Sequence, residues 1–200
     1  MCGRLLLMVL ITRLVLVAAL LPQSSVPANG QALFDQGKTY EEFLAAADAR
    51  PETWKANTDR AKPSKELVDR LKTAAGQDLR LLVVAVAACS DSVHTVPYVA
   101  ALAREAGVPL RIVDSTVGKP VMEAFRTPDG RAATATVAVM RGDRIVGAWV
   151  ERPVALQTWL LGPASSLQQG ERMERKFGWY EWDRGESTIA ELVELIERHR

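Results

Sequence analysis

The stretch LRLLVVAVAACSDSVHTVPYVAALAREAGVPLRIV, residues 79–113, decides the fold class. Its first nine residues are almost continuously apolar and rich in valine, which is typical of a central strand covered on both faces. Apolar residues then recur with helical spacing over residues 93–106, and Gly107 marks the end of that helix. Residues 110–113 form a second short apolar run. The stretch therefore predicts a β-α-β unit with a right-handed crossover, and hence an α/β fold.

Three helices are expected before this unit. Residues 40–49 are rich in helix-forming residues, and Pro51 suits the first turn of a second helix that carries Trp54. Ser64 is placed to cap a third helix, whose apolar face continues until Gly76. Together these helices form an N-terminal helical extension of the β-α-β unit.

A short helix over residues 120–125 and a β-hairpin are expected after the unit. Two apolar runs, residues 134–140 and 145–150, flank the turn sequence Arg141-Gly142-Asp143-Arg144. Turn chemistry explains this Arg-Gly-Asp string without any adhesive role. The hairpin adds antiparallel strands to the sheet.

The C-terminal part of the chain is expected to be helical. A helix follows Pro153, residues 162–170 are loop-like, and residues 177–182 (FGWYEW) form an aromatic cluster, interpreted as a lid packed on the core. Thr188, with Glu191 three positions later, has the spacing of a capping box that starts the last helix.

Length and composition exclude several classes of protein. The chain has 200 residues, 48% of them hydrophobic, which is enough for a substantial core and is not typical of a disordered protein. Its 25 basic and 24 acidic residues leave no net positive field to hold nucleic acid. One mature cysteine and two distant histidines do not supply a closed metal site, so none is expected.

Residues 1–28 have the pattern of a cleaved secretory signal peptide. Arg4 and Arg13 are their only charges, residues 14–21 are unbroken apolar sequence, and small residues lead to Ala28. We therefore expect a periplasmic or secreted protein that contacts a membrane only if the leader stays uncleaved as an anchor. The true start is Met1 or Met8. Removal of the leader changes the formal net charge from +1 to −1 and leaves Cys89 as the sole cysteine.

Cys89 is placed where a reactive thiol is favoured. It follows the central strand and directly precedes the helix, and the unpaired N–H groups of a helix N-terminus favour the thiolate. Asp91, two residues later, would oppose a thiolate if it is ionised nearby. The competing interpretation is that Cys89 is a small buried hydrophobic residue.

The cysteine region resembles the thioredoxin family. The site reads Ala88-Cys89-Ser90-Asp91-Ser92, and Pro97 matches the helix-kinking proline of that family. Further stretches resemble a bacterial subfamily with an N-terminal helical extension: residues 40–43 (YEEF), 121–124 (VMEA), 149–153 (WVERP) and 183–188 (DRGEST).

The resemblance implies a thioredoxin-like three-layer α/β/α sandwich. It would contain a central mixed sheet with the β-α-β unit, a C-terminal β-hairpin and extra N-terminal helices. The thioredoxin-like domain would span residues 38–200, divided into an N-terminal extension, 38–76, a core, 79–160, and a C-terminal lid and helix, 161–200.

The sequence departs from the family pattern at the site itself. The position of the resolving cysteine is Ser92, that of the usual tryptophan is Ala88, and that of the usual glycine is Ser90. The family's cis-proline corresponds to Ala135, where we expect a trans peptide bond, because a cis bond before a residue other than proline costs about 2.5–4 kcal/mol. By this resemblance, the candidate catalytic residues are Cys89 as nucleophile, Asp91 and Ser92, and the substrate-binding residues are Ala88, Ser90, Thr134, Ala135 and Thr136.

The sequence thus predicts an exported protein that uses Cys89 for single-cysteine thiol–disulfide exchange or thiol redox sensing. Its partner would be a protein or a small thiol or disulfide. No cofactor is expected, and glutathione or another low-molecular-weight thiol is a candidate co-substrate. The alternatives are a redox-inactive binding module of the same fold and a homodimer linked through Cys89. Dithiol activity is disfavoured by Ser92.

Two further groups are interpreted as structural. His94 is expected on the polar surface of the helix, about 140° around the axis from Cys89, which argues against a Cys-His hydrolase. Glu151 and Arg152 are interpreted as exposed charges at the end of a strand.

Overall fold

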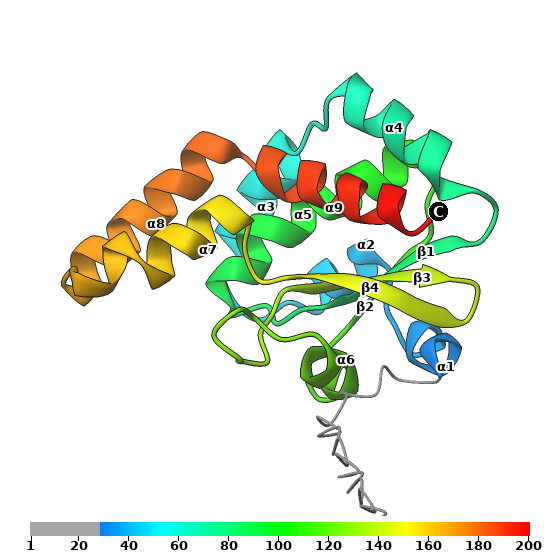
Figure 1. The fold of residues 1–200 in the computed structure, drawn as a ribbon, viewed down its shortest axis with the longest axis horizontal. Coiled ribbons are helices and arrows are strands. Elements are labelled where there is room, and N and C mark those ends of the chain that lie inside the picture. The colour runs from blue at the N-terminus through cyan, green and yellow to red at the C-terminus, as the bar shows by residue number, and fades with distance from the viewer. Residues whose placement is uncertain (1–28) are drawn as a thin grey trace, which may run out of the picture.

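A four-stranded mixed sheet forms the centre of the computed structural model, which describes residues 29–200 (Figure 1). The predicted signal peptide lies outside the described residues. The strands are β1 (Leu79–Val84), β2 (Leu110–Val113), β3 (Thr136–Arg141) and β4 (Arg144–Val150). Their order in the sheet is β2-β1-β3-β4, with β1 parallel to β2 and the other neighbours antiparallel. The β-α-β unit and the hairpin are therefore confirmed.

Strand β1 is buried on both faces, as its apolar sequence predicts. Leu81 pairs with Leu110 of β2 on one side and with Val139 of β3 on the other. The turn between β3 and β4 contains Gly142 at φ 60°, a conformation that glycine adopts without steric penalty. Strand β1 leads directly into the loop that carries Cys89.

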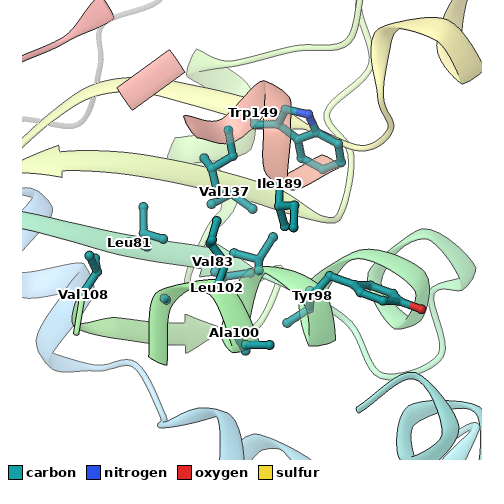
Figure 2. Close-up of a cluster of buried hydrophobic side chains, with 14 of the residues drawn as sticks. Leu81, Val83, Tyr98, Ala100, Leu102, Val108, Val137, Trp149 and Ile189 are labelled. Atoms are coloured by element: carbon teal, nitrogen blue, oxygen red, sulfur yellow. The ribbon is translucent and has the colours of Figure 1, made fainter. Parts of the chain in front are cut away.

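Helices cover both faces of the sheet and make three layers (Figure 1). The larger core lies between the sheet and one group of helices: α2 (Tyr40–Ala45), α3 (Pro51–Arg60), α4 (Lys65–Ala75), α5 (Ser90–Ala106) and α9 (Glu186–Arg198). Figure 2 shows Leu81, Val137 and Ile189 of this core, contributed by β1, β3 and α9. The opposite face carries a smaller cluster under α1 (Gly30–Asp35) and α6 (Lys119–Ala124). The α/β/α sandwich with extra helices is confirmed.

Two helices extend beyond the sheet on one side. They are α7 (Val154–Leu161) and α8 (Gln169–Asp183), joined through a short 3₁₀ helix, η1 (Pro163–Ser166) (Figure 1). The aromatic segment predicted as a packed lid lies within α8. Tyr180 is buried, but Trp182 is 77% exposed, so only one face of this helix packs on the core.

Helix starts and ends partly follow the sequence signals. Ser64 caps α4 by accepting a hydrogen bond from the Leu67 amide, and Gly107 ends α5 in the left-handed conformation. The expected capping box at Thr188 is wrong, because α9 begins at Glu186 after Gly185, which places Thr188 inside the helix. Helix α1, six residues long, was not predicted.

Among residues 29–200, no helix combines the length and the apolar character needed to cross a bilayer.

Candidate functional site

Cys89 occupies the N-cap position of α5, the longest helix among the described residues. Its amide donates to the Val86 carbonyl at 3.0 Å, and its carbonyl accepts from the Val93 amide at 3.1 Å. The side chain is partly exposed and forms no disulfide. The thiol therefore lies at the positive end of a 17-residue helix, on a residue that is partly exposed.

The Cys89 sulfur faces the loop before β3. Its thiol donates a hydrogen bond to the Thr134 carbonyl, with an S···O distance of 3.3 Å. The side chains of Ala135 and Thr136 are fully buried, so only Thr134 of this predicted trio presents part of its side chain to solvent.

The peptide bond between Thr134 and Ala135 is cis, so the predicted trans bond is wrong. The prediction used only the local preference of the chain. In the folded protein, hydrogen bonds fix this loop, because the Ala135 carbonyl accepts from the Glu151 amide at 2.7 Å and the Thr136 hydroxyl donates to Ala133 at 2.7 Å. Tertiary contacts therefore outweigh the local preference.

Helix α3 holds the loop that precedes Cys89. The Arg50 side chain donates from Nε to the Ala88 carbonyl at 2.8 Å, and the Trp54 indole donates to the Ala87 carbonyl at 3.1 Å. Asn57 donates to the Val93 carbonyl at 2.7 Å. The predicted extension thus contributes directly to the position of Cys89.

Ser92 lies in the position of a resolving cysteine but faces the interior. It is fully buried, and its hydroxyl accepts a hydrogen bond from the Val86 amide at 3.4 Å. Ala88 is exposed and Ser90 is half-buried beside Cys89. Of the residues next to Cys89, Ala88, Ser90 and Thr134 are therefore at least partly exposed, whereas Ser92 lies in the interior and binds the Val86 amide.

Asp91 is buried in the first turn of α5 and interacts with three side chains. Its carboxylate lies 2.8 Å from Nζ of Lys176, 3.1 Å from Nε of Arg152 and 2.6 Å from the Tyr180 hydroxyl. Burial raises the pKa of Asp91, but the charges and hydrogen bonds of Lys176 and Arg152 outweigh it and lower the pKa overall. The ionised carboxylate is balanced by two cations, which weakens its expected opposition to a thiolate.

Glu151 and Arg152 belong to the same buried network, so their interpretation as exposed charges is wrong. Glu151 is 4% exposed, and its carboxylate accepts from both terminal nitrogens of Arg131 at 3.0 and 2.9 Å. Arg152 donates to Glu151 at 2.6 Å as well as to Asp91. Arg131 also binds Asp129, whose pKa its hydrogen bonds lower to about 2. The charges alternate in sign from Lys176 to Asp129.

His94 is buried, which contradicts its predicted place on the helix surface. It is 7% exposed, its ring stacks on Tyr180 with centroids 4.8 Å apart, and its Nδ1 lies 2.7 Å from the Ser90 carbonyl. Helix α8 covers this face of α5, which the sequence of α5 alone could not indicate. Burial is the main cause that lowers the pKa of His94.

Sequence reasoning missed the network because its members are far apart in the chain. Asp91 lies 61 residues from Arg152 and 85 from Lys176. The available signal was the charged pair Glu151-Arg152, which stands directly between an apolar strand and Pro153.

Comparisons with known proteins identify the same fold. No curated protein sequence gives a significant match. Two solved structures are similar, an HIV epitope scaffold and a protein of unknown function from Pseudomonas aeruginosa. The first has 20% identity and a TM-score of 0.61 over 85% of this chain and 98% of that chain. The second has 19% identity and a TM-score of 0.60 over 84% and 96%.

At these identities the two structures support the fold alone. A family model described as thioredoxin matches residues 37–171, which is more than half of the chain and includes Cys89, Asp91 and the loop at Thr134. The chain therefore belongs to the thioredoxin family.

Proposed function

We propose that the protein uses Cys89 as a single redox thiol, in thiol–disulfide exchange or in thiol sensing. The observation that carries the proposal is the position of Cys89, a partly exposed residue with a free thiol, at the N-cap of α5. A helix N-terminus stabilises the thiolate, which is the form that attacks a disulfide.

The exchange would proceed in two balanced steps. The Cys89 thiol loses its proton to solvent, and the thiolate attacks one sulfur of a substrate disulfide. A mixed disulfide forms, and the other substrate sulfur leaves as a thiolate that takes up a proton. An external thiol, after losing its proton, then attacks the substrate sulfur of the mixed disulfide and forms a new disulfide with it, and Cys89 leaves as a thiolate that takes up a proton. Ser92 has no sulfur for this second step, so the external thiol is required.

The partner in this second step would be glutathione, another low-molecular-weight thiol or a protein thiol.

We further propose that the mature chain acts in the periplasm or outside the cell, after cleavage of residues 1–28. The support is the sequence pattern of this segment, with two arginines before or within an apolar run and small residues before Ala28. The N-terminal sequence of the natural protein tests this export, and an intact Met1 or Met8 on protein in the cytosol would contradict it.

A redox-inactive binding module is the second candidate function. The buried, hydrogen-bonded Ser92 and the alanine at position 88 favour it, because both differ from the dithiol pattern. A binding role would use the surface around Ala88 and Thr134 without chemistry at Cys89.

Mass spectrometry of the protein after incubation with glutathione disulfide separates the two functions. A Cys2→Ser background leaves Cys89 as the sole thiol. We expect one glutathione per chain, removed again by excess reduced glutathione, and none on the Cys89→Ser variant. A folded chain that acquires no glutathione would leave the binding module as the better account.

A further inference from the structure

Cys89 is part of a closed ring of interactions. Its thiol donates to the Thr134 carbonyl, and the next carbonyl, that of Ala135, accepts from the Glu151 amide. The following residue, Arg152, donates to Asp91, which lies two residues after Cys89 in the first turn of α5. The ring thus joins the loop that faces the sulfur to the helix that carries it.

Glu151 holds both ends of the segment that faces Cys89. Its amide binds the Ala135 carbonyl at 2.7 Å, and its carboxylate binds both terminal nitrogens of Arg131. Thr134 lies between these two tethers. Glu151 itself has a φ of 67° and is buried, so its backbone turns inward at the end of β4 and presents both groups to the same loop.

The hydrogen bond from Cys89 to the Thr134 carbonyl is one that only a protonated sulfur can make, because a carbonyl oxygen accepts and cannot donate. A carbonyl oxygen accepts a hydrogen bond from a thiol, whereas it presents its lone pairs to a thiolate and disfavours that form. The other ionisable groups around this helix start lie on several elements: Arg50 before α3, Asp91 and His94 on α5, Asp129 and Arg131 in the loop before β3, Glu151 and Arg152 after β4, and Lys176 and Tyr180 on α8. Among the three carboxylates, Asp91 pairs with Lys176 and Arg152, Glu151 with Arg131 and Arg152, and Asp129 with Arg131.

We propose that Glu151 is a positioning residue that holds the Thr134 carbonyl against Cys89 and thereby restrains formation of the thiolate. This inference rests on the proposed function of Cys89 as a reactive thiol. Glu151 acts through the 131–135 segment and does not touch the substrate. Release of that segment frees the sulfur from its acceptor, while the helix N-terminus continues to favour the thiolate.

The test is the rate of Cys89 alkylation by iodoacetamide at pH 6 and at pH 9, in the Cys2→Ser background. The rate at pH 6 divided by the rate at pH 9 reports how much of the thiol is already ionised at pH 6. Steric access affects both rates equally and cancels in this ratio. Glu151→Gln keeps the size of the side chain but removes the charge that binds Arg131 and Arg152. We expect it to raise the ratio by about threefold to tenfold, the effect of losing one hydrogen bond to the thiol.

Glu123→Gln, an identical change on the exposed surface of α6, is the matched control and should leave the ratio unchanged. Arg131→Gln breaks the same tether from its more exposed end and should raise the ratio if Glu151→Gln does not fold. Urea unfolding of each variant measures stability separately, since a purely structural role would lower stability without a change in the ratio.

An unchanged or lower ratio in the folded variants would overturn the positioning role, as would a native chain in which Cys89 is not alkylated at either pH. Alkylation requires no disulfide partner. A wild-type chain that is alkylated but forms no mixed disulfide with glutathione disulfide would therefore contradict the proposed function and leave the positioning role standing.

Discussion

Asp91 is the residue at which most buried interactions around the helix start converge. It accepts hydrogen bonds from Lys176, Arg152 and Tyr180, and its carboxylate balances two cations that are themselves largely buried. Removal of one partner from a buried ion pair leaves a charge without compensation, which is more costly than loss of the pair as a whole.

Asp91→Asn is therefore expected to destabilise the protein by about 3–5 kcal/mol, because Lys176 loses its counter-charge and Arg152 keeps only Glu151. Asp69→Asn on α4, which removes an exposed pair with Lys65, is the matched control and should have a far smaller effect. Urea unfolding at neutral pH measures both. Equal effects of the two substitutions would show that the cluster is solvated and contributes little.

His94 gives the protein a pH-dependent stability near neutrality. Because its pKa is lowered in the folded state, the unfolded chain binds more protons once the pH falls below the ordinary histidine value of about 6.5. Stability is thus complete above that pH and decreases as the pH falls through it. The lowered pKa of Asp91 has its effect only below the ordinary aspartate value of about 3.9.

We expect the free energy of unfolding to fall between pH 7.5 and pH 5.5, and the fall to shrink in His94→Asn. Asparagine can reproduce the Nδ1 hydrogen bond to Ser90 but does not titrate. His199→Asn changes an exposed histidine and should keep the wild-type slope. If His94→Asn retains the full slope and His199→Asn loses it, the assignment to the buried ring is wrong.

At the scale of the elements, two helix starts that look alike in sequence differ in the structure. Ser64 caps α4, whereas Thr188 lies inside α9, where its Oγ1 is buried and has no hydrogen-bond partner among the described residues. Glu191, its expected partner, instead accepts from the Trp149 indole at 2.8 Å and from the Val154 amide at 2.8 Å. Packing of α9 against β4 and α7 has replaced the local cap.

Ser64→Ala should therefore cost about 1 kcal/mol, the usual value for a lost N-cap. Thr188→Val should be neutral or slightly stabilising, because it replaces an unpaired buried hydroxyl by a methyl group of the same shape. Thermal unfolding compares the two variants. A loss of stability in Thr188→Val equal to that in Ser64→Ala would restore the predicted capping box.

The elements that the sequence predicts well are those whose signals are local. The apolar run at β1, the spacing along α5 and the turn at Gly142 each require only neighbouring residues. The failures involve contacts between distant segments. Helix α8 buries His94, the loop at Ala135 is fixed by Glu151, and the partners of Asp91 come from α8 and from the segment after β4. A single sequence carries no record of such pairs.

At the scale of the whole molecule, the sheet and its two helical layers bring four separate segments to one place. The end of β1 and the start of α5 carry Cys89, the loop before β3 supplies Thr134, the end of β4 supplies Glu151, and α3 supports the loop through Arg50 and Trp54. Within residues 29–200 the fold thus positions one cysteine, Cys89, at a helix start.

Native-state alkylation of Cys89 tests this account most directly. In the Cys2→Ser background without denaturant, iodoacetamide should label Cys89 at a rate that is proportional to reagent concentration and unaffected by urea below the unfolding transition. Such behaviour requires a sulfur that is accessible in the folded chain. Labelling that begins only as the protein unfolds would place the sulfur inside the core and contradict the role of Cys89 as a redox thiol.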